Sequence, residues 1–175
     1  MRGESQAVHQ GTQLAATCGL HAVNHAQRPL GTLHTWAQFD SWSKDDEKSP
    51  SGDWDIAALN RNLDAAGALV RPVEGDAWTT LARWYPEQAT LALWSPDTLG
   101  CVMHVPGHWV ALSRPDGPQT EDAAALLCDS LHKKPFALGV EEVRQLFARM
   151  GAYQRNASLQ EAGKWSLYVV AREDP

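Results

Sequence analysis

QLAATCGLHAVNH, residues 13–25, contains the first of three cysteines in the chain, at the point where a run of small residues becomes an apolar helical pattern. Apolar residues recur on one face of a helix that the spacing predicts over residues 18–27, and the Arg28-Pro29 pair predicts where it ends. Cys18 therefore lies at a helix start, where a thiol is either a buried structural side chain or a nucleophile. The choice depends on whether a histidine and a group that orients it occur further along the chain.

Two more helices are expected in the first half of the chain. Aromatic residues recur at every third position in residues 35–43, which predicts a helix. The polar, turn-rich segment SKDDEKSPSGD, residues 43–53, then predicts an exposed loop. Asp53 or Asp55 can cap the third helix, which is expected to stop near Gly67.

The second half of the chain has the pattern of a sheet. Short apolar runs separated by proline and glycine turns predict strands, and the last run is apolar enough to be a central strand. The expected strands cover residues 68–75, 89–94, 101–105, 108–113, 125–130 and 165–172, and the expected helices cover 77–85 and 139–151, the latter closed by Gly151. A helical half followed by an antiparallel sheet of about five to six strands is an α+β architecture.

The length of 175 residues predicts a single domain over residues 1–175, with residues 1–12 expected to be flexible. The chain has 15 lysine and arginine residues against 21 aspartate and glutamate residues, so its formal net charge is −6. Nucleic-acid binding usually leaves a basic footprint, and the longest basic cluster is only His132-Lys133-Lys134. We therefore expect no nucleic-acid partner.

The three cysteines include no CxxC pair, which favours a reducing compartment such as the cytoplasm over a disulfide framework. The first residues contain no apolar segment typical of a signal peptide. No apolar run approaches the roughly 20 residues needed to span a membrane. We therefore expect a cytoplasmic protein without a membrane partner; delivery into a host cell by a route that needs no such signal stays open.

Residues further along the chain supply what thiol catalysis needs, which is a thiolate, a base and a group that orients the base. Cys18 is the candidate nucleophile, because a helix N-terminus and a nearby imidazolium lower a thiol pKa from about 8.5 to roughly 3.5–7.5. Its small neighbours are expected to leave the sulfur accessible. His108, which opens a predicted strand after Pro106-Gly107, is the candidate base, and Asp129, at the end of the next strand, is the candidate orienting group. Gln13 and the Cys18 backbone N–H are the candidate oxyanion donors.

Other residues compete with this set. His21 lies one helical turn after Cys18 and is expected to be structural, because it points along the helix. Cys101, His104 and His108 have a zinc-like spacing, but this spacing straddles a Pro-Gly turn and lacks a fourth ligand, so we expect no metal.

Three tryptophans are candidates for contact with a substrate. Trp36 and Trp54 flank the polar segment at 43–53 and are expected either to pack the helices together or to touch a substrate. Trp109 follows His108 directly and is placed to shield the imidazole from water.

Together these motifs resemble the Josephin domain, the fold of a family of papain-like, deubiquitinating cysteine proteases. The matching stretches, in the order of the family, are QLAATCGLHAVNH, SGDWDIAALNRNL, GHWVALSRPDG and CDSLHKKP. Cys18 aligns with the family's nucleophile, and His21 and Asn24 match its C-x-x-H-x-x-N pattern. Gln13 matches the oxyanion glutamine, and HWVAL matches the histidine motif. Asp129 falls where the family has Asn or Asp before Ser.

The chain departs from the family pattern at two places. The stretch between the HWVAL and DS motifs is longer than expected, so Asp116 and Asp122 are further candidates for the partner of His108. Residues 31–52, which correspond to the substrate-gripping helical hairpin, are compact, and this leaves the linkage preference open.

The resemblance implies a cysteine-type deubiquitinase that uses Cys18, His108 and Asp129 to hydrolyse bonds at or near the C-terminus of conjugated ubiquitin. It implies ubiquitin, polyubiquitin or a ubiquitin-like protein as the partner, a monomeric enzyme and no cofactor. Two alternatives keep the same fold. One is a papain-like peptidase or acyltransferase that acts on another protein, and the other is a catalytically silent ubiquitin-binding module.

Overall fold

The computed structural model describes residues 17–43, 54–74, 77–116, 123–156 and 165–173. Its α-helices in these ranges are α2 (Thr17–Ala26), α3 (Trp36–Trp42), α4 (Ile56–Asp64), α5 (Ala77–Leu81) and α6 (Val140–Arg155), and its 3₁₀-helices are η1 (Arg28–Leu30) and η3 (Pro86–Gln88). Its strands are β1 (Ala68–Pro72), β2 (Trp84–Tyr85), β3 (Thr90–Leu91), β4 (Thr98–Val105), β5 (His108–Ser113), β6 (Ala125–Cys128), β7 (Phe136–Leu138) and β8 (Ser166–Arg172). None of the helices in the described ranges is long and apolar enough to cross a membrane.

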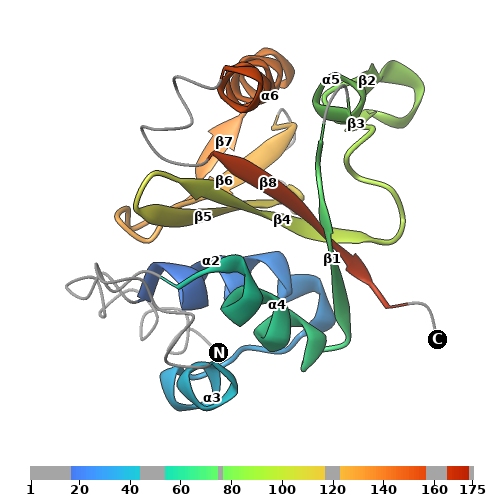
Figure 1. The fold of residues 1–175 in the computed structure, drawn as a ribbon. Helices are drawn as coiled ribbons and strands as arrows, with labels where there is room; N and C mark the ends of the chain where they lie inside the picture. Colours follow the sequence, from blue (N-terminus) through green and yellow to red (C-terminus); the bar gives the residue numbers. More distant parts are fainter. Residues whose placement is uncertain (1–16, 44–53, 75–76, 117–122, 157–164, 174–175) are drawn as a thin grey trace.

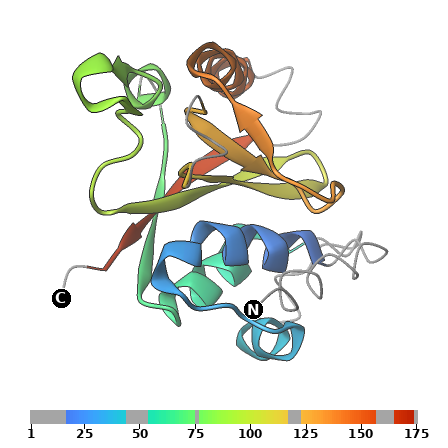
Figure 2. The ribbon, with the colours of Figure 1, turned by 180° about the vertical axis from the view of Figure 1, so that it is seen from behind.

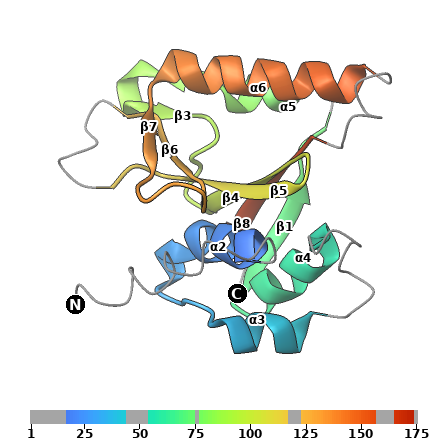
Figure 3. The same cartoon turned by 90° about the vertical axis from the view of Figure 1, so that its left-hand side faces the viewer.

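Six strands form one antiparallel sheet in the order β1-β8-β4-β5-β6-β7, and β2 and β3 form a separate hairpin. β8 lies between β1 and β4, so the interior position expected for the last strand is confirmed. The helices α2, α3 and α4 lie on one side of the sheet, and α5 and α6 lie on the other (Figure 1, Figure 3). The described part of the chain is therefore α+β, as the sequence predicts.

Each face of the sheet has its own hydrophobic core. The core under α2 includes the fully buried side chains of Val23, Leu59 and Val102. The core under α6 includes Phe147 and Met103, which are 1% exposed. Burying large apolar side chains on both faces supplies the main driving force for folding of such a layered structure.

The helix α2 packs closely on the middle of the sheet, and eight of its ten residues are buried. A Cβ atom on Gly100 of β4 would lie 2.9 Å from both the Cα and the carbonyl oxygen of Ala26. Only glycine fits between this strand and the helix backbone. The contact fixes how closely α2 approaches the sheet, and with it the position of Cys18 at the other end of the helix.

Polar side chains fasten the helices α3 and α4 to α2, and Figure 2 shows α3 on the side of α2 away from the sheet. The buried amide of Asn24 exchanges two hydrogen bonds with the backbone of His34, donating to its carbonyl at 2.9 Å and accepting from its N–H at 2.8 Å. The Arg61 side chain donates to the carbonyl of Trp42 at 3.1 Å. The helix pair is therefore anchored at both ends of α3.

Side-chain caps set where these two helices begin. The Thr35 hydroxyl accepts a hydrogen bond from the N–H of Gln38, and the Asp55 carboxylate accepts from the N–H groups of Ala57 and Ala58. Of the two caps considered for the third helix, Asp55 is the one used, and Asp53 lies outside the described residues. Such caps satisfy N–H groups that a helix leaves unpaired at its start.

The expected end of the last helix at Gly151 is wrong, because α6 continues to Arg155. Gly151 is buried, and a Cβ atom there would lie 3.6 Å from Cγ of Trp78. Gly151 therefore lies inside the helix, on the side that faces α5, and does not end it. The short edge strand β7 was not expected at all.

Two other predicted elements are longer than the observed ones. The helix expected over residues 77–85 ends at Leu81, because Trp84 and Tyr85 pair with β3 as the strand β2. The strand expected over residues 89–94 is limited to Thr90 and Leu91. Pairing across a hairpin outweighed the local helical pattern in this segment.

Candidate active site

Cys18 lies in the first turn of α2, the end of the helix where the backbone dipole favours negative charge. The residue is only 4% exposed, so the expectation that its small neighbours leave the sulfur accessible is wrong. Gly19 beside it serves packing, since a Cβ atom there would lie 3.2 Å from Leu59 Cδ1 and 3.3 Å from Phe39 Cζ. The start of α2 is held between the sheet and the helices α3 and α4.

His108 is the first residue of β5 and follows the Pro106-Gly107 turn that joins β4 to β5. Gly107 has a φ of 70°, a left-handed conformation that glycine adopts at little cost. The turn places His108 at the rim of the sheet, where its side chain is 17% exposed. The imidazole is thus positioned by a tight hairpin rather than by a long loop.

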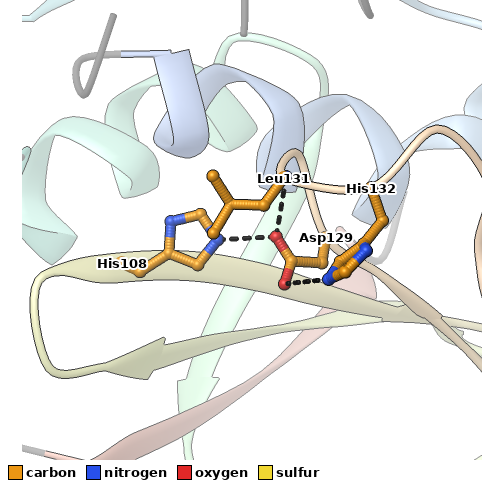
Figure 4. A network of polar contacts seen from close by, with 4 residues as sticks. All are labelled: His108, Asp129, Leu131 and His132. Carbon is orange, nitrogen blue, oxygen red and sulfur yellow. Dashed lines mark hydrogen bonds and ion pairs between the residues drawn. The ribbon is translucent and has the colours of Figure 1, made fainter. Parts of the chain in front are cut away.

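The structure brings His108 and Asp129 together, with His108 Nε2 2.8 Å from Asp129 Oδ1 (Figure 4). The strands β5 and β6 are antiparallel, with Ala111 opposite Cys128, so the residue after Cys128 is carried toward the start of β5. Asp116 follows the other end of β5, a strand length away from His108. Asp122, the other candidate partner, lies outside the described residues.

The side chain of Cys18 hydrogen-bonds the same imidazole, and this contact is the largest cause of a raised pKa of His108, about 9. Burial works in the opposite direction, and the hydrogen bond and charge of Asp129 add to the rise. Because Nε2 faces Asp129, Nδ1 is the ring nitrogen left for the sulfur, and it points away from the carboxylate in Figure 4. The imidazole ring therefore bridges the Cys18 sulfur and the Asp129 carboxylate, and its raised pKa favours the protonated ring.

Asp129 remains ionised next to this imidazolium. Burial raises the pKa of the Asp129 carboxyl, but the backbone N–H of Leu131 and the His108 side chain outweigh burial and hold it below its usual value. The Leu131 N–H donates to Oδ1 at 2.9 Å, and His132 Nε2 lies 3.9 Å from Oδ2 (Figure 4). A carboxylate fixed in this way orients the imidazole and stabilises its charged form.

The other two cysteines have different surroundings. Cys101 is fully buried in β4, and burial raises the pKa of its thiol. Burial also raises the pKa of Cys128, whose sulfur lies 3.7 Å from the Ser113 hydroxyl and 3.8 Å from the Leu126 carbonyl. Both thiols are therefore protonated at neutral pH, which suits a structural role.

The oxyanion donors are described only in part, because Gln13 lies outside the described residues. The backbone N–H of Cys18 belongs to the first turn of α2, where N–H groups point out of the helix end. A negatively charged oxygen on a carbon attached to the Cys18 sulfur would meet this positive end of the helix.

The three candidate tryptophans differ in exposure. Trp54 and Trp109 are each 3% exposed, and the Trp109 indole donates a hydrogen bond to the Trp54 carbonyl at 2.6 Å. Both therefore pack the region behind the site and offer a substrate almost no surface. Trp36 is 39% exposed at the start of α3 and is the one of the three that presents a ring to solvent.

The competing histidines lie outside this triad. His21 is buried on α2 with its ring 4.6 Å from that of His25, in agreement with a structural role. His104 pairs across the β4–β5 hairpin with Trp109, with 4.6 Å between the ring centres. Within the described residues, no group of three or more His, Cys, Asp or Glu side chains is placed to hold a metal ion.

Sequence reasoning missed two further groups at the Asp129 carboxylate, the N–H of Leu131 at Oδ1 and His132 Nε2 at Oδ2. The N–H of Leu131 reaches the carboxylate two residues earlier, a turn that aspartate commonly forms. The D-x-x-H spacing of Asp129 and His132 was the other available signal. No protein-family model matches the chain, and no curated protein matches it significantly.

Proposed function

We propose that this protein is a papain-like cysteine hydrolase of the Josephin type that cleaves ubiquitin conjugates. One observation carries the chemical part of the proposal: the His108 imidazole hydrogen-bonds the Cys18 side chain and also lies 2.8 Å from the Asp129 carboxylate. This is the nucleophile, base and orienting group of thiol catalysis, contributed by α2, β5 and the end of β6.

The reaction follows from this arrangement. The Cys18 sulfur, as a thiolate paired with the imidazolium, attacks the carbonyl carbon of the scissile bond. The Cys18 backbone N–H and Gln13 stabilise the oxyanion. His108 gives its proton to the leaving nitrogen as the C–N bond breaks and a thioester remains. A water molecule then loses a proton to His108 and attacks the thioester, which releases the acid and restores the thiolate.

Support for ubiquitin as the acyl group comes from the order of the sequence motifs that resemble the Josephin family. The helix pair α3 and α4 also lies beside the start of α2, where such a family has its substrate-gripping hairpin. Leu33, which precedes α3, is 50% exposed, and Trp36, the first residue of α3, is 39% exposed. They provide apolar surface for a protein substrate on that side.

The test is intact-mass spectrometry after incubation with ubiquitin that carries a C-terminal electrophile. We expect one adduct on the wild-type protein and none on Cys18→Ala. Cys101→Ala is the matched control, because it also removes a buried thiol but lies in β4, and it should keep the adduct. Circular dichroism confirms that all three are folded.

Other outcomes separate the alternatives. Modification of Cys18→Ala would contradict the proposed nucleophile. A folded wild-type protein that stays unmodified by the ubiquitin probe but reacts with generic peptide electrophiles would replace ubiquitin with another protein substrate, as in the peptidase or acyltransferase alternative. A folded protein whose Cys18 reacts with neither probe would leave only a silent binding module.

A further inference from the structure

The loop between β6 and β7 is the most exposed apolar segment beside the triad. Residues 131–137 are all exposed, and of the four large apolar side chains that stand out as exposed in the described residues, two lie here. Leu131 is 69% exposed and Phe136 is 44% exposed. We call residues 131–136 the triad loop; its last residue, Phe136, is the first residue of β7.

The triad loop is also basic in an otherwise acidic protein. It contains His132, Lys133 and Lys134, and no acidic residue occurs between Asp129 and Glu141. The whole chain has a formal net charge of −6. Apolar side chains next to a local basic cluster fit a partner surface that combines an apolar side chain with acidic residues.

Direct contacts join the triad loop to the catalytic residues. The ring of Phe136 lies 4.7 Å from that of His132, and His132 Nε2 lies 3.9 Å from the carboxylate of Asp129. Figure 4 shows that the backbone of Leu131 and the ring of His132 both contact the Asp129 carboxylate, which also faces His108. A molecule that reaches the triad therefore also reaches this loop.

The chemistry decides which part of a substrate lies on this side. An acid must stand within hydrogen-bond reach of the atom that it protonates, so the leaving nitrogen lies on the His108 side of the Cys18 sulfur. Asp129 lies on the other side of the imidazole from that sulfur, and the triad loop follows Asp129. The chain that carries the leaving amine therefore extends toward the triad loop, whereas the acyl part lies on the side of Cys18.

We propose that the triad loop binds the leaving-group polypeptide of the substrate and selects for acidic and apolar residues around the amine. This inference rests on the proposed function. Leu131 and Phe136 supply the apolar contacts, and Lys133 and Lys134 supply the charge. The loop thus sets which conjugated protein is cleaved, separately from recognition of ubiquitin itself.

Three substrates with the same acyl group test this inference. The first is ubiquitin joined by an isopeptide bond to a peptide lysine flanked by Asp, Glu and Leu. The second carries a peptide flanked by Arg and Gly, and the third is ubiquitin amidated with a small fluorophore, which has no polypeptide leaving group. We expect wild-type kcat/KM to be about tenfold higher for the acidic conjugate than for the basic one, a size usual for a few charged contacts.

Charge-reversal variants locate the source of the preference. Lys133→Glu/Lys134→Glu should abolish or invert the preference, and Phe136→Ser should reduce kcat/KM for the acidic conjugate more than for the fluorophore substrate. Arg144→Glu/Arg149→Glu makes the same charge change on exposed positions of α6, across the sheet, and should keep the preference. The wild-type preference should also shrink as salt is raised.

The results distinguish the two proposals. If the fluorophore substrate is cleaved but the wild type treats both peptide conjugates alike, or if Lys133→Glu/Lys134→Glu keeps the preference, the role of the triad loop is wrong while the proposed function stands. If the folded protein fails to cleave even the fluorophore substrate, the proposed function fails, and the inference fails with it.

Discussion

The indole N–H of Trp109 donates a hydrogen bond to the backbone carbonyl of Trp54 across 2.6 Å, between two residues that are each 3% exposed. Trp109 is the neighbour of His108 on β5, and Trp54 precedes α4. This contact holds the helix pair and the strand that begins with His108 as one unit. The ring of Trp54 also lies edge-on to Phe39 of α3, at 5.7 Å, which extends the unit to that helix.

Trp109→Phe should destabilise the protein and weaken catalysis together. Phenylalanine keeps most of the ring but leaves the buried carbonyl of Trp54 without this donor, which costs about 1–3 kcal/mol. Urea unfolding followed by fluorescence measures the loss, and the ubiquitin-fluorophore substrate measures activity. Trp36→Phe, at an exposed position, is the control and should change stability by less than about 0.5 kcal/mol. Equal stabilities of the two variants would contradict the role given to the hydrogen bond.

Asp129→Asn should move the alkaline limit of activity to lower pH. The active ion pair needs a protonated His108, whose pKa is raised to about 9, first by the Cys18 hydrogen bond and further by Asp129. Removing the carboxylate charge removes part of this rise, so kcat/KM should begin to fall at a lower pH. We also expect a loss of about a hundredfold at the optimum, at the lower end of general acid–base contributions. The measurement is a pH–rate profile for the wild type and the variant.

Asp116→Asn is the matched control for that profile, because it neutralises an exposed carboxylate beyond the far end of β5. Its alkaline limit should coincide with that of the wild type. His132→Gln removes only the 3.9 Å contact to the other carboxylate oxygen and should have a smaller effect than Asp129→Asn. An unchanged limit in Asp129→Asn would show that the carboxylate does not support the imidazolium.

The stability of the protein should depend on pH through His108. The pKa of this residue is raised from 6.5 to about 9 on folding, so its contribution to stability is complete below pH 6.5 and is lost as the pH rises through 9. The slope in that window is at most about 1.4 kcal/mol per pH unit. Asp129 acts in the opposite sense, because its lowered pKa gives a contribution that is lost as the pH falls through the folded value.

Urea unfolding at pH 6, 8 and 10 tests this linkage when the wild type is compared with His108→Gln. The difference in unfolding free energy between the two proteins should be largest at pH 6 and smallest at pH 10. A difference that is constant with pH would mean that His108 titrates alike in the folded and unfolded protein, and would remove the ion pair from the site.

Much of the site was predictable because its parts follow local rules. A cysteine at a helix start, a histidine after a Pro-Gly turn and an aspartate at the end of the next strand each have a sequence signature, and antiparallel pairing of β5 and β6 brings the last two together. The exposure of Cys18 was not predictable in this way. Cys18 is buried in the hydrophobic core on this side of the sheet, whose members Phe39 and Leu59 are distant from it in sequence.

The predicted ends of helices were wrong where contacts with distant parts of the chain outweighed the local sequence signal. Gly151 has the sequence context of a helix end, but α6 continues past it to Arg155, with the buried glycine facing Trp78 of α5. The helical pattern over residues 77–85 was cut short by pairing of β2 with β3. In the triad loop, only the short basic cluster at residues 132–134 could be recognised from the sequence. The sequence around it does not show that the loop lies next to the carboxylate partner of His108.

Gly100→Ala should disturb the active site from the far end of α2. The new methyl group would lie 2.9 Å from the Cα and carbonyl oxygen of Ala26 and 3.1 Å from the carbonyl oxygen of Leu112. These are backbone atoms that cannot turn aside, so α2 must move off the sheet and carry Cys18 with it. We expect a loss of about 1–3 kcal/mol in unfolding free energy, as for other overpacked sites. Activity of the molecules that remain folded should also fall, because a displacement of about 1 Å can reduce catalysis a hundredfold.

Gly139→Ala is the matched control for this substitution. It also adds one methyl group, but at the start of α6, where the nearest atom is Glu142 Oε2 at 3.7 Å and φ is −73°. Differential scanning calorimetry and the ubiquitin-fluorophore assay should therefore separate the two variants. If Gly139→Ala keeps near-normal activity while folded Gly100→Ala has a reduced rate, the close packing of α2 on the sheet positions the Cys18 sulfur. Full activity in a destabilised Gly100→Ala would show instead that Cys18 is positioned by its own contacts at the start of α2.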